Sequence, residues 1–144
     1  MRLTRRYRFS ASHRLHSGQL SGEENRQLYG KCNNPFGHGH DYILEVTVSG
    51  PLDALSGRVV NVNELDELVR TEVLGPFDHA NLNAQAAAFA GQPPTSENVA
   101  LEILGRLRRR WSEAIRGAAP VLEKIKLQET RRNIFEVSSS ENED

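Results

Sequence analysis

Two segments in the first third of the chain alternate between apolar and polar residues, which is typical of half-buried β-strands. Over residues 3–13 the apolar side chains occupy mostly odd positions, and His13 continues that parity. Over residues 38–49 the apolar side chains occupy mostly even positions, and His38 and His40 share their parity. Since alternate residues of a strand face the same side of a sheet, the pattern predicts three histidines on inward-facing positions of two strands.

A long polar stretch, Ser17–Pro35, separates these two strands and is rich in Gly, Asn and Ser. This composition predicts a long loop. Long loops inside compact domains are usually functional, so the stretch is a candidate part of a site.

Two helices are predicted in the middle of the chain. Asn63 is a good N-cap, and apolar residues at helical spacing follow it until Gly75. A second and longer helix begins after Thr95 or Ser96, both good caps, and its apolar stripe ends before Gly117.

Two more alternating segments, 121–128 and 134–137, predict the last strands. The order strand, strand, helix, helix, strand, strand predicts an α+β domain with helices on one face of an antiparallel sheet. We expect one domain over residues 1–137 and a disordered, acidic, serine-rich tail over 138–144.

Composition narrows the classes of function. The 144 residues carry 18 Lys and Arg against 19 Asp and Glu, so no overall field attracts nucleic acid or an anionic membrane. No apolar run reaches membrane-spanning length, and the basic N-terminus lacks the apolar stretch of a secretory signal. The single cysteine, Cys32, excludes an intramolecular disulfide and fits a reducing compartment. We therefore expect a cytoplasmic protein.

The tripeptide His38-Gly39-His40 is the strongest local sign of chemistry. Its two imidazoles point to the same side of a strand, and His13 can supply a third from the neighbouring strand. Taken alone, the tripeptide is more often an accidental pair of core or surface histidines. Three histidines of inward parity are instead typical of a catalytic zinc site, in which a fourth position stays open.

Cys32 lies in the polar loop beside Lys31. A lone cysteine is often an inert apolar residue. Here the polar surroundings, the lysine and a nearby Zn²⁺ favour a thiolate with a low pKa that acts as an acid or base. A fourth zinc ligand is the alternative role for Cys32.

Two acidic positions are further candidates. Asp78 precedes His79 after the first predicted helix, and a carboxylate beside an imidazole can fix its tautomer. Glu129 continues the inward parity of the strand 121–128, where a carboxylate needs a partner, or where it can bind the donor edge of a heterocycle. A turn residue at a strand end explains Glu129 equally well.

Taken together, these segments resemble the 6-pyruvoyltetrahydropterin synthase family from about Arg5 to Val137. The resemblance rests on the order and spacing of five stretches: Phe9-Ser10-Ala11-Ser12-His13-Arg14-Leu15, Tyr29 to His40, Phe77-Asp78-His79 with Asn81-Leu82, Pro94 to Ala100, and Gln128-Glu129-Thr130.

The resemblance implies a zinc-dependent lyase of the tunnelling fold, in which ββααββ subunits join into barrels, commonly as a homohexamer made from two trimers. It implies roles for ten residues: zinc ligation by His13, His38 and His40, catalysis by Cys32, Asp78 and His79, pterin anchoring by Glu129, and a place near the pterin pocket for Thr95, Ser96 and Glu97. The Asp78-His79 pair would reach the site from a neighbouring subunit.

Within the family, one branch eliminates triphosphate from 7,8-dihydroneopterin triphosphate to give 6-pyruvoyltetrahydropterin, in tetrahydrobiopterin biosynthesis. Another branch makes 6-carboxytetrahydropterin for queuosine. Cys32 stands six positions before His38, as in the pyruvoyl enzymes, and the loop Leu20–Asn25 also resembles theirs. Phe36 departs from that pattern, where a small or polar residue is usual.

Two other classes of function remain possible at this point. One is a three-histidine zinc hydrolase in which Cys32 is incidental, and the other is a non-catalytic oligomeric module in which Cys32 completes a four-ligand zinc site. For the pterin enzyme, cationic side chains must meet the triphosphate. The candidates are Lys31, Arg5, Arg6, Arg14 and Arg131.

Overall fold

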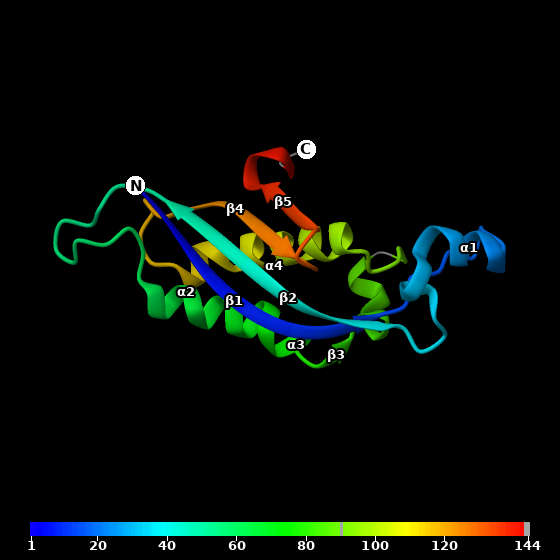
Figure 1. Cartoon of the computed structure of the whole chain (residues 1–144). Helices are drawn as coiled ribbons and strands as arrows, with labels where there is room; N and C mark the ends of the chain where they lie inside the picture. Colours follow the sequence, from blue (N-terminus) through cyan, green and yellow to red (C-terminus); the bar gives the residue numbers. More distant parts are fainter. Residues whose placement is uncertain (90, 143–144) are drawn as a thin grey trace.

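The computed structural model describes residues 1–89 and 91–142 and forms a twisted sheet with helices packed against it (Figure 1). The sheet order is β3-β1-β2-β4-β5. The strands are β1 (Arg2–His13), β2 (His38–Ser49), β3 (Ala80–Asn81), β4 (Val121–Gln128) and β5 (Ile134–Ser138). The helices are α1 (Gly22–Tyr29), α2 (Val62–Val69), α3 (Gly75–Phe77) and α4 (Ser96–Ala114), with shorter 3-10 or π segments at Gly30–Asn33, Arg70–Leu74, Leu82–Phe89 and Ser139–Asn142.

The long antiparallel pair of β1 and β2 positions the histidines. Arg2 pairs with Ser49 at one end, and His13 pairs with His38 at the other. Residues directly opposite each other in such a pair face the same side, so the predicted inward parity of the histidines is confirmed.

The hydrophobic core lies between one face of the sheet and the helices. From the sheet it contains the fully buried Tyr42, Leu44 and Leu127, and from the helices Leu65 and Ile103. Figure 1 shows α2 and α4 behind the long strands, while α1 stands apart at the end where β1 stops and β2 begins. The layered α+β arrangement predicted from the sequence is confirmed.

The sheet is mixed, whereas the sequence predicted an antiparallel one. The four long strands pair antiparallel, but β3 pairs parallel with the end of β1 through Ala11 and Ser12. A two-residue strand has no alternation to detect, and it forms here because the chain returns past β1 after α3.

The predicted loop Ser17–Pro35 contains a helix and a 3-10 turn, so that prediction is wrong for Gly22–Asn33. Ser21 caps α1 by accepting from the Glu24 N–H, and the Glu24 carboxylate accepts in return from the Ser21 N–H. This reciprocal capping box is visible in the sequence as Ser-x-x-Glu.

The predicted helix boundaries shift by a few residues. Asn61, rather than Asn63, caps α2, and its side chain accepts from two N–H groups. Helical structure continues past Gly75 to Phe77 through a π segment, because Gly75 keeps right-handed helical angles. In α4 the cap is Thr95, one of the two expected.

The expected disorder of the tail, 138–144, stays a prediction. Ser138 ends β5, Ser139–Asn142 form a 3-10 turn, and residues 143 and 144 lie outside the described part of the chain. Among the described helices, none combines the length and apolar character needed to cross a membrane.

Candidate metal centre

Four side chains from three separate parts of the chain converge beyond the ends of β1 and β4. The possible ligand atoms of His13, Cys32, His40 and Glu129 all lie within 4.8 Å of one another. We call these four residues the histidine group. His13 ends β1, His40 lies in β2, Cys32 comes from the 3-10 turn before β2, and Glu129 directly follows β4. Residues so far apart in sequence meet only because the sheet aligns its strand ends.

His13 is held in one tautomer. Its Nδ1 lies 2.9 Å from the carbonyl oxygen of Pro94. Since a carbonyl can only accept, Nδ1 must donate, and Nε2 keeps its lone pair free on the side of the group. Metal-binding histidines usually have such an outer hydrogen bond, which fixes the ring and makes the other nitrogen a better ligand.

The two ring nitrogens that converge are spaced as a metal would require. His40 Nε2 lies 3.2 Å from His13 Nε2. Two nitrogens bound to one tetrahedral zinc lie roughly 3.3–3.4 Å apart, given bond lengths of about 2.0–2.1 Å. Burial lowers the pKa of both histidines, so both rings are neutral near pH 7 and can offer lone pairs. The donor set therefore fits a zinc ion.

The Cys32 thiol lies close enough to His40 for either role expected from the sequence, that of an acid or base or that of a fourth zinc ligand. Its Sγ lies 3.9 Å from His40 Nε2. Burial and the neighbouring Glu129 raise the pKa of the Cys32 thiol. This is opposite to the low pKa expected from the sequence. A thiolate therefore requires a cation at the site, because the protein's own groups oppose it.

Glu129 faces the histidines. Its Oε1 lies 3.1 Å from His40 Nε2 and 4.0 Å from His13 Nε2, and the side chain is 13% exposed. The carboxylate is thus nearly buried among groups that can donate to it or share a cation with it. Glu129 is a turn residue at a strand end, since its N–H donates to the Asn133 carbonyl at 3.1 Å, and its side chain also faces the site, so both explanations from the sequence apply.

Two buried hydroxyl groups beside the histidine group make no hydrogen bond of standard geometry with the described residues, although each has the other as a neighbour, and Ser96 lowers the pKa of Tyr42. They belong to Tyr42 on β2 and to Ser96 at the start of α4. The charges of Glu129 and Cys32 both act on Tyr42, and burial is the main reason that its pKa is raised. Buried hydroxyls that lack a good hydrogen bond are rare in native proteins, and they indicate a place for a ligand or water.

The remaining residues of the predicted metal and pterin sites lie nearby. The His38 ring stands 4.8 Å from that of His40, between centroids, and its charge lowers the pKa of both His13 and His40. His38 does not belong to the converging group of four. Thr95 caps α4 through its side chain, and Glu97 in the first turn is exposed.

The Asp78-His79 pair lies at the sheet edge, where His79 lines a surface hollow together with Ser10 and His40. The Ser10 N–H donates to Asp78 Oδ1 at 2.9 Å, and the His79 N–H donates to the Ser10 carbonyl at 2.6 Å. The His79 side chain is 83% exposed, 3.6 Å from the Asp78 carboxylate. Its backbone has a φ of 57°, which is uncommon outside glycine and often marks a functional position.

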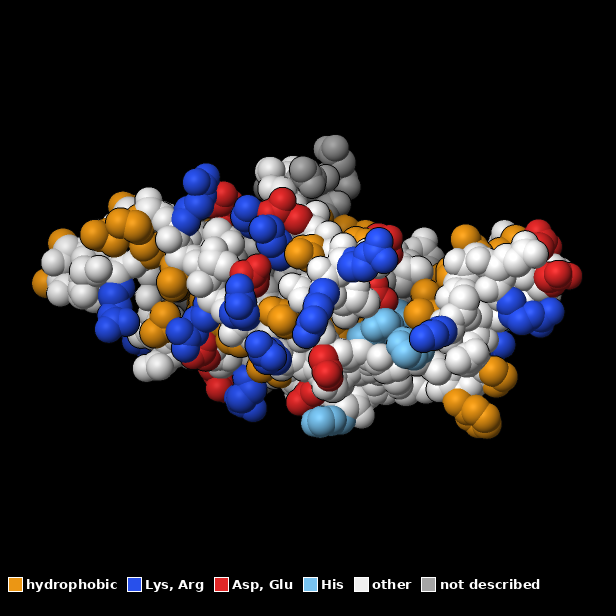
Figure 2. Space-filling view, viewed as in Figure 1, with side chains coloured by type: hydrophobic (Ala, Val, Ile, Leu, Met, Phe, Trp, Pro, Cys, Tyr) orange, Lys and Arg blue, Asp and Glu red, His pale blue; other side chains and the backbone are white. Residues whose placement is uncertain are grey.

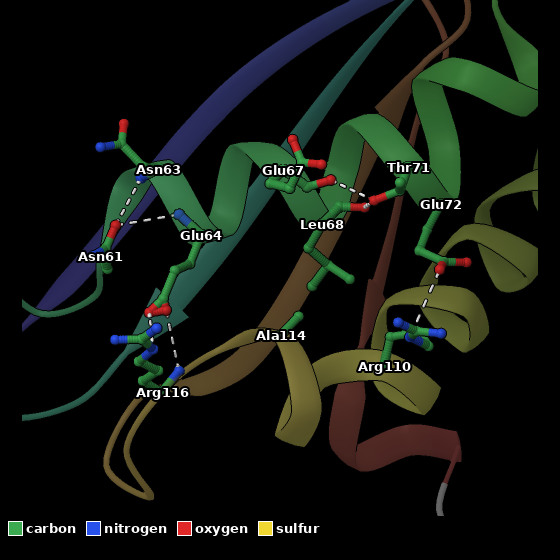
Figure 3. Close-up of a pocket in the computed structure, with 10 residues that line it drawn as sticks. All are labelled: Asn61, Asn63, Glu64, Glu67, Leu68, Thr71, Glu72, Arg110, Ala114 and Arg116. Carbon is green, nitrogen blue, oxygen red and sulfur yellow. Dashed lines mark hydrogen bonds and ion pairs between the residues drawn. The ribbon is translucent and has the colours of Figure 1, made fainter.

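A surface hollow lies elsewhere, between α2 and α4 (Figure 3). Its floor is Leu68 and Ala114, and its charges pair with one another, as in the Glu72–Arg110 pair at 3.9 Å. Because these charges are already neutralised locally, we assign the hollow no chemistry.

Sequence reasoning missed the Pro94 carbonyl that orients His13 and the buried hydroxyl of Tyr42. No sequence signal identifies a backbone carbonyl as a partner. Tyr42 shares the parity of His40, but that pattern indicates only burial.

Fold and site together define an α+β protein with a buried group of histidine, cysteine and glutamate side chains suited to a divalent metal. The sequence profile of the 6-pyruvoyl tetrahydropterin synthase family matches residues 2–140. The chain is 45% identical over 133 residues to the 6-pyruvoyl tetrahydrobiopterin synthase of Drosophila melanogaster, covering 92% of this chain and 76% of that protein. It is 44% identical over 132 residues to that of Homo sapiens, covering 92% and 87%.

The solved structure of the Caenorhabditis elegans 6-pyruvoyl tetrahydropterin synthase has the same fold, with a TM-score of 0.84 and 37% identity. The match covers 96% of this chain and 95% of that one. This chain belongs to the 6-pyruvoyl tetrahydropterin synthase family, as its sequence motifs indicated.

Proposed function

We propose that this protein is a 6-pyruvoyltetrahydropterin synthase that eliminates triphosphate from 7,8-dihydroneopterin triphosphate. The convergence of His13, His40, Cys32 and Glu129 carries the proposal, because it joins metal ligands, a thiol and a pterin-binding carboxylate in one site. The pyruvoyl names of the relatives, together with the six-residue step from Cys32 to His38, favour this product over the carboxy product.

We propose zinc as the metal and His13, His38 and His40 as its ligands, of which His13 and His40 belong to the histidine group and His38 stands with its ring centroid 4.8 Å from that of His40. When bound, zinc would act as a Lewis acid that makes protons of the substrate side chain easier to remove. The hydrogen bond from His13 to the Pro94 carbonyl supports this ligand role, because it leaves Nε2 free.

The other residues of the site would bind the pterin ring or transfer protons. Glu129 would accept hydrogen bonds from the donor edge of the pterin ring, with the Ser96 hydroxyl beside it and Thr95 and Glu97 near the pocket. Cys32 would take a proton from the substrate side chain and return it during the rearrangement. The product keeps the oxidation level of the substrate as a whole, so no external redox cofactor is needed.

The structure narrows the candidates for triphosphate binding. Arg5 forms an ion pair with Asp66, and Arg6 forms one with Glu45. Arg14 donates to the Asn33 carbonyl. Figure 2 shows such lysine and arginine side chains with carboxylates between them.

Three of the five cations have no ion-pair partner in the described part of the chain, and one of these, Arg14, is hydrogen-bonded to the Asn33 carbonyl. Lys31 and Arg131 are exposed and adjoin Cys32 and Glu129 in sequence. We assign triphosphate binding to Lys31 and Arg131. Because salt screens exposed charges, binding of the substrate should weaken as the salt concentration rises.

Assembly would complete the site. The β3 pairing covers only the end of β1, so the rest of that edge and the outer edge of β5 have no partner strand within the described chain. Pairing of these edges between subunits would close a barrel and remove exposed strand edges. We propose a homohexamer of 1–137 domains, in which Asp78 and His79 of one subunit approach Cys32 of another.

The test is to incubate the zinc-loaded protein with 7,8-dihydroneopterin triphosphate and to identify the pterin product by mass. The expected product is 6-pyruvoyltetrahydropterin with release of triphosphate, and the Cys32→Ala variant serves as the inactive control. Formation of 6-carboxytetrahydropterin would assign the other branch. Unchanged substrate under conditions in which a known pyruvoyl enzyme turns over would refute the proposal.

A further inference from the structure

The peptide that follows His13 is hydrogen-bonded to the Cys32 turn at two points. The Leu15 N–H donates to the Cys32 carbonyl at 2.6 Å. In return, the Asn33 side-chain amide donates to the Leu15 carbonyl at 2.6 Å. Leu15 is thus bonded through both of its backbone polar groups to two consecutive residues of the turn.

Both hydrogens of the Asn33 amide have acceptors. Nδ2 faces the Leu15 carbonyl, which fixes the orientation of the amide, because a carbonyl can only accept. The same Nδ2 lies 3.0 Å from Nδ1 of His16, which must then be the acceptor. Asn33 is 7% exposed, so a lost bond would leave a buried polar group without a partner rather than one in contact with water.

The segment that Asn33 binds is itself fixed from the other side. The Asn83 side chain accepts from the Arg14 N–H at 2.6 Å and donates to the Arg14 carbonyl at 2.8 Å. Residues 14–16, directly after His13, are therefore held in place by hydrogen bonds. Because the Cys32 turn is bonded to this segment through Leu15 and Asn33, the position of Cys32 relative to His13 and His40 depends on these bonds.

We propose that Asn33 is a positioning residue that holds the Cys32 thiol close to the other members of the histidine group. The inference rests on the proposed function for its catalytic consequence. The thiol must lie within reach of a substrate proton, and misplacement by about 1 Å can cost roughly a hundredfold in rate. Leu15 and His16 use both N–H donors of the Asn33 amide.

The test uses Asn33→Asp, which keeps the shape of the side chain but removes both donors, and Asn33→Ala as a second variant. The matched control is Asn25→Ala. Asn25 is also a buried asparagine in the same loop region, but it binds the backbone of Ser17 and Leu20 rather than that of residues next to Cys32.

In the Asn33 variants we expect kcat to fall about tenfold or more, with KM changed less than about twofold and metal content unchanged. We also expect alkylation of Cys32 by iodoacetamide, at one fixed pH, to become severalfold faster because the turn is released. The Asn25→Ala variant should lose thermal stability without either effect. If one Asn33 variant does not fold, the other gives the same readouts.

The positioning role would be overturned if the Asn33 variants kept the wild-type rate of Cys32 alkylation and the wild-type kcat. It would also be overturned if Asn25→Ala changed both quantities by the same amount as the Asn33 variants. If the wild-type protein itself does not turn over the pterin triphosphate, the proposed function fails. The alkylation rates still decide whether Asn33 holds Cys32 in place.

Discussion

Tyr7 and Tyr42 present opposite hydrogen-bonding situations, so the same substitution should change stability in opposite directions. The Tyr42 hydroxyl is buried and meets the Ser96 hydroxyl without a hydrogen bond of standard geometry, while its ring stacks on Phe9 with centroids 4.9 Å apart. The Tyr7 hydroxyl donates to the Asp66 carboxylate at 2.7 Å. Tyr42→Phe removes a poorly satisfied polar atom and keeps the ring, whereas Tyr7→Phe removes a bond.

The magnitudes follow from these contacts. A poorly satisfied buried hydroxyl costs about 1–3 kcal/mol, and loss of the Ser96 contact offsets part of this cost, so Tyr42→Phe should raise the free energy of unfolding by up to about 1 kcal/mol. Tyr7→Phe should lower it by about 1–2 kcal/mol, since the lost acceptor is charged. In a chain of this length, 1 kcal/mol corresponds to a shift in Tm of roughly 2–5 °C.

Urea denaturation of the metal-free protein, at one fixed protein concentration, measures both changes. We expect the stabilised Tyr42→Phe variant to bind pterin more weakly, because a group kept poorly satisfied at a site is available to a ligand. Tyr7→Phe should bind pterin normally. If Tyr42→Phe destabilises the protein as much as Tyr7→Phe does, the Tyr42 hydroxyl makes a good hydrogen bond in the folded protein and the reasoning is wrong.

Three further predictions concern charge, binding and assembly. The Arg5 guanidinium holds the pKa of Asp66 below its ordinary value. The stability that the Arg5–Asp66 pair contributes is therefore present above about pH 4 and is lost as the pH falls through the lowered pKa. Asp66→Asn should therefore cost about 0.5–1 kcal/mol at pH 7, since both partners are about 40% exposed, and progressively less in urea titrations at lower pH. Glu129→Ala should weaken pterin binding in calorimetry while metal analysis still finds zinc, and unchanged affinity would contradict its role. Mixed oligomers of inactive Cys32→Ala and inactive His79→Ala chains should recover part of the activity, and oligomers that form but stay inactive would exclude a shared site.

The sequence determined the elements and the faces that they present. Alternation along residues 3–13 and 38–49 placed three histidines on the inner parity, because the side-chain direction of a strand is a local property. Capping residues and turn residues located the two main helices within a few positions. The capping box at Ser21 was equally readable, and overlooking it left α1 as a loop.

Only the tertiary structure decided which chemical groups meet. Cys32 and Glu129 are separated by 97 positions in the sequence (129 − 32), and their approach to His40 depends on the register of β2 with β4 and on the bonds that fix the Cys32 turn. The pKa of the Cys32 thiol is set in the same way, since burial and the Glu129 carboxylate, which follows β4, both raise it. Local patterns set which way a side chain points, but distances and dielectric surroundings arise from packing between distant segments, and these control the chemistry of the site.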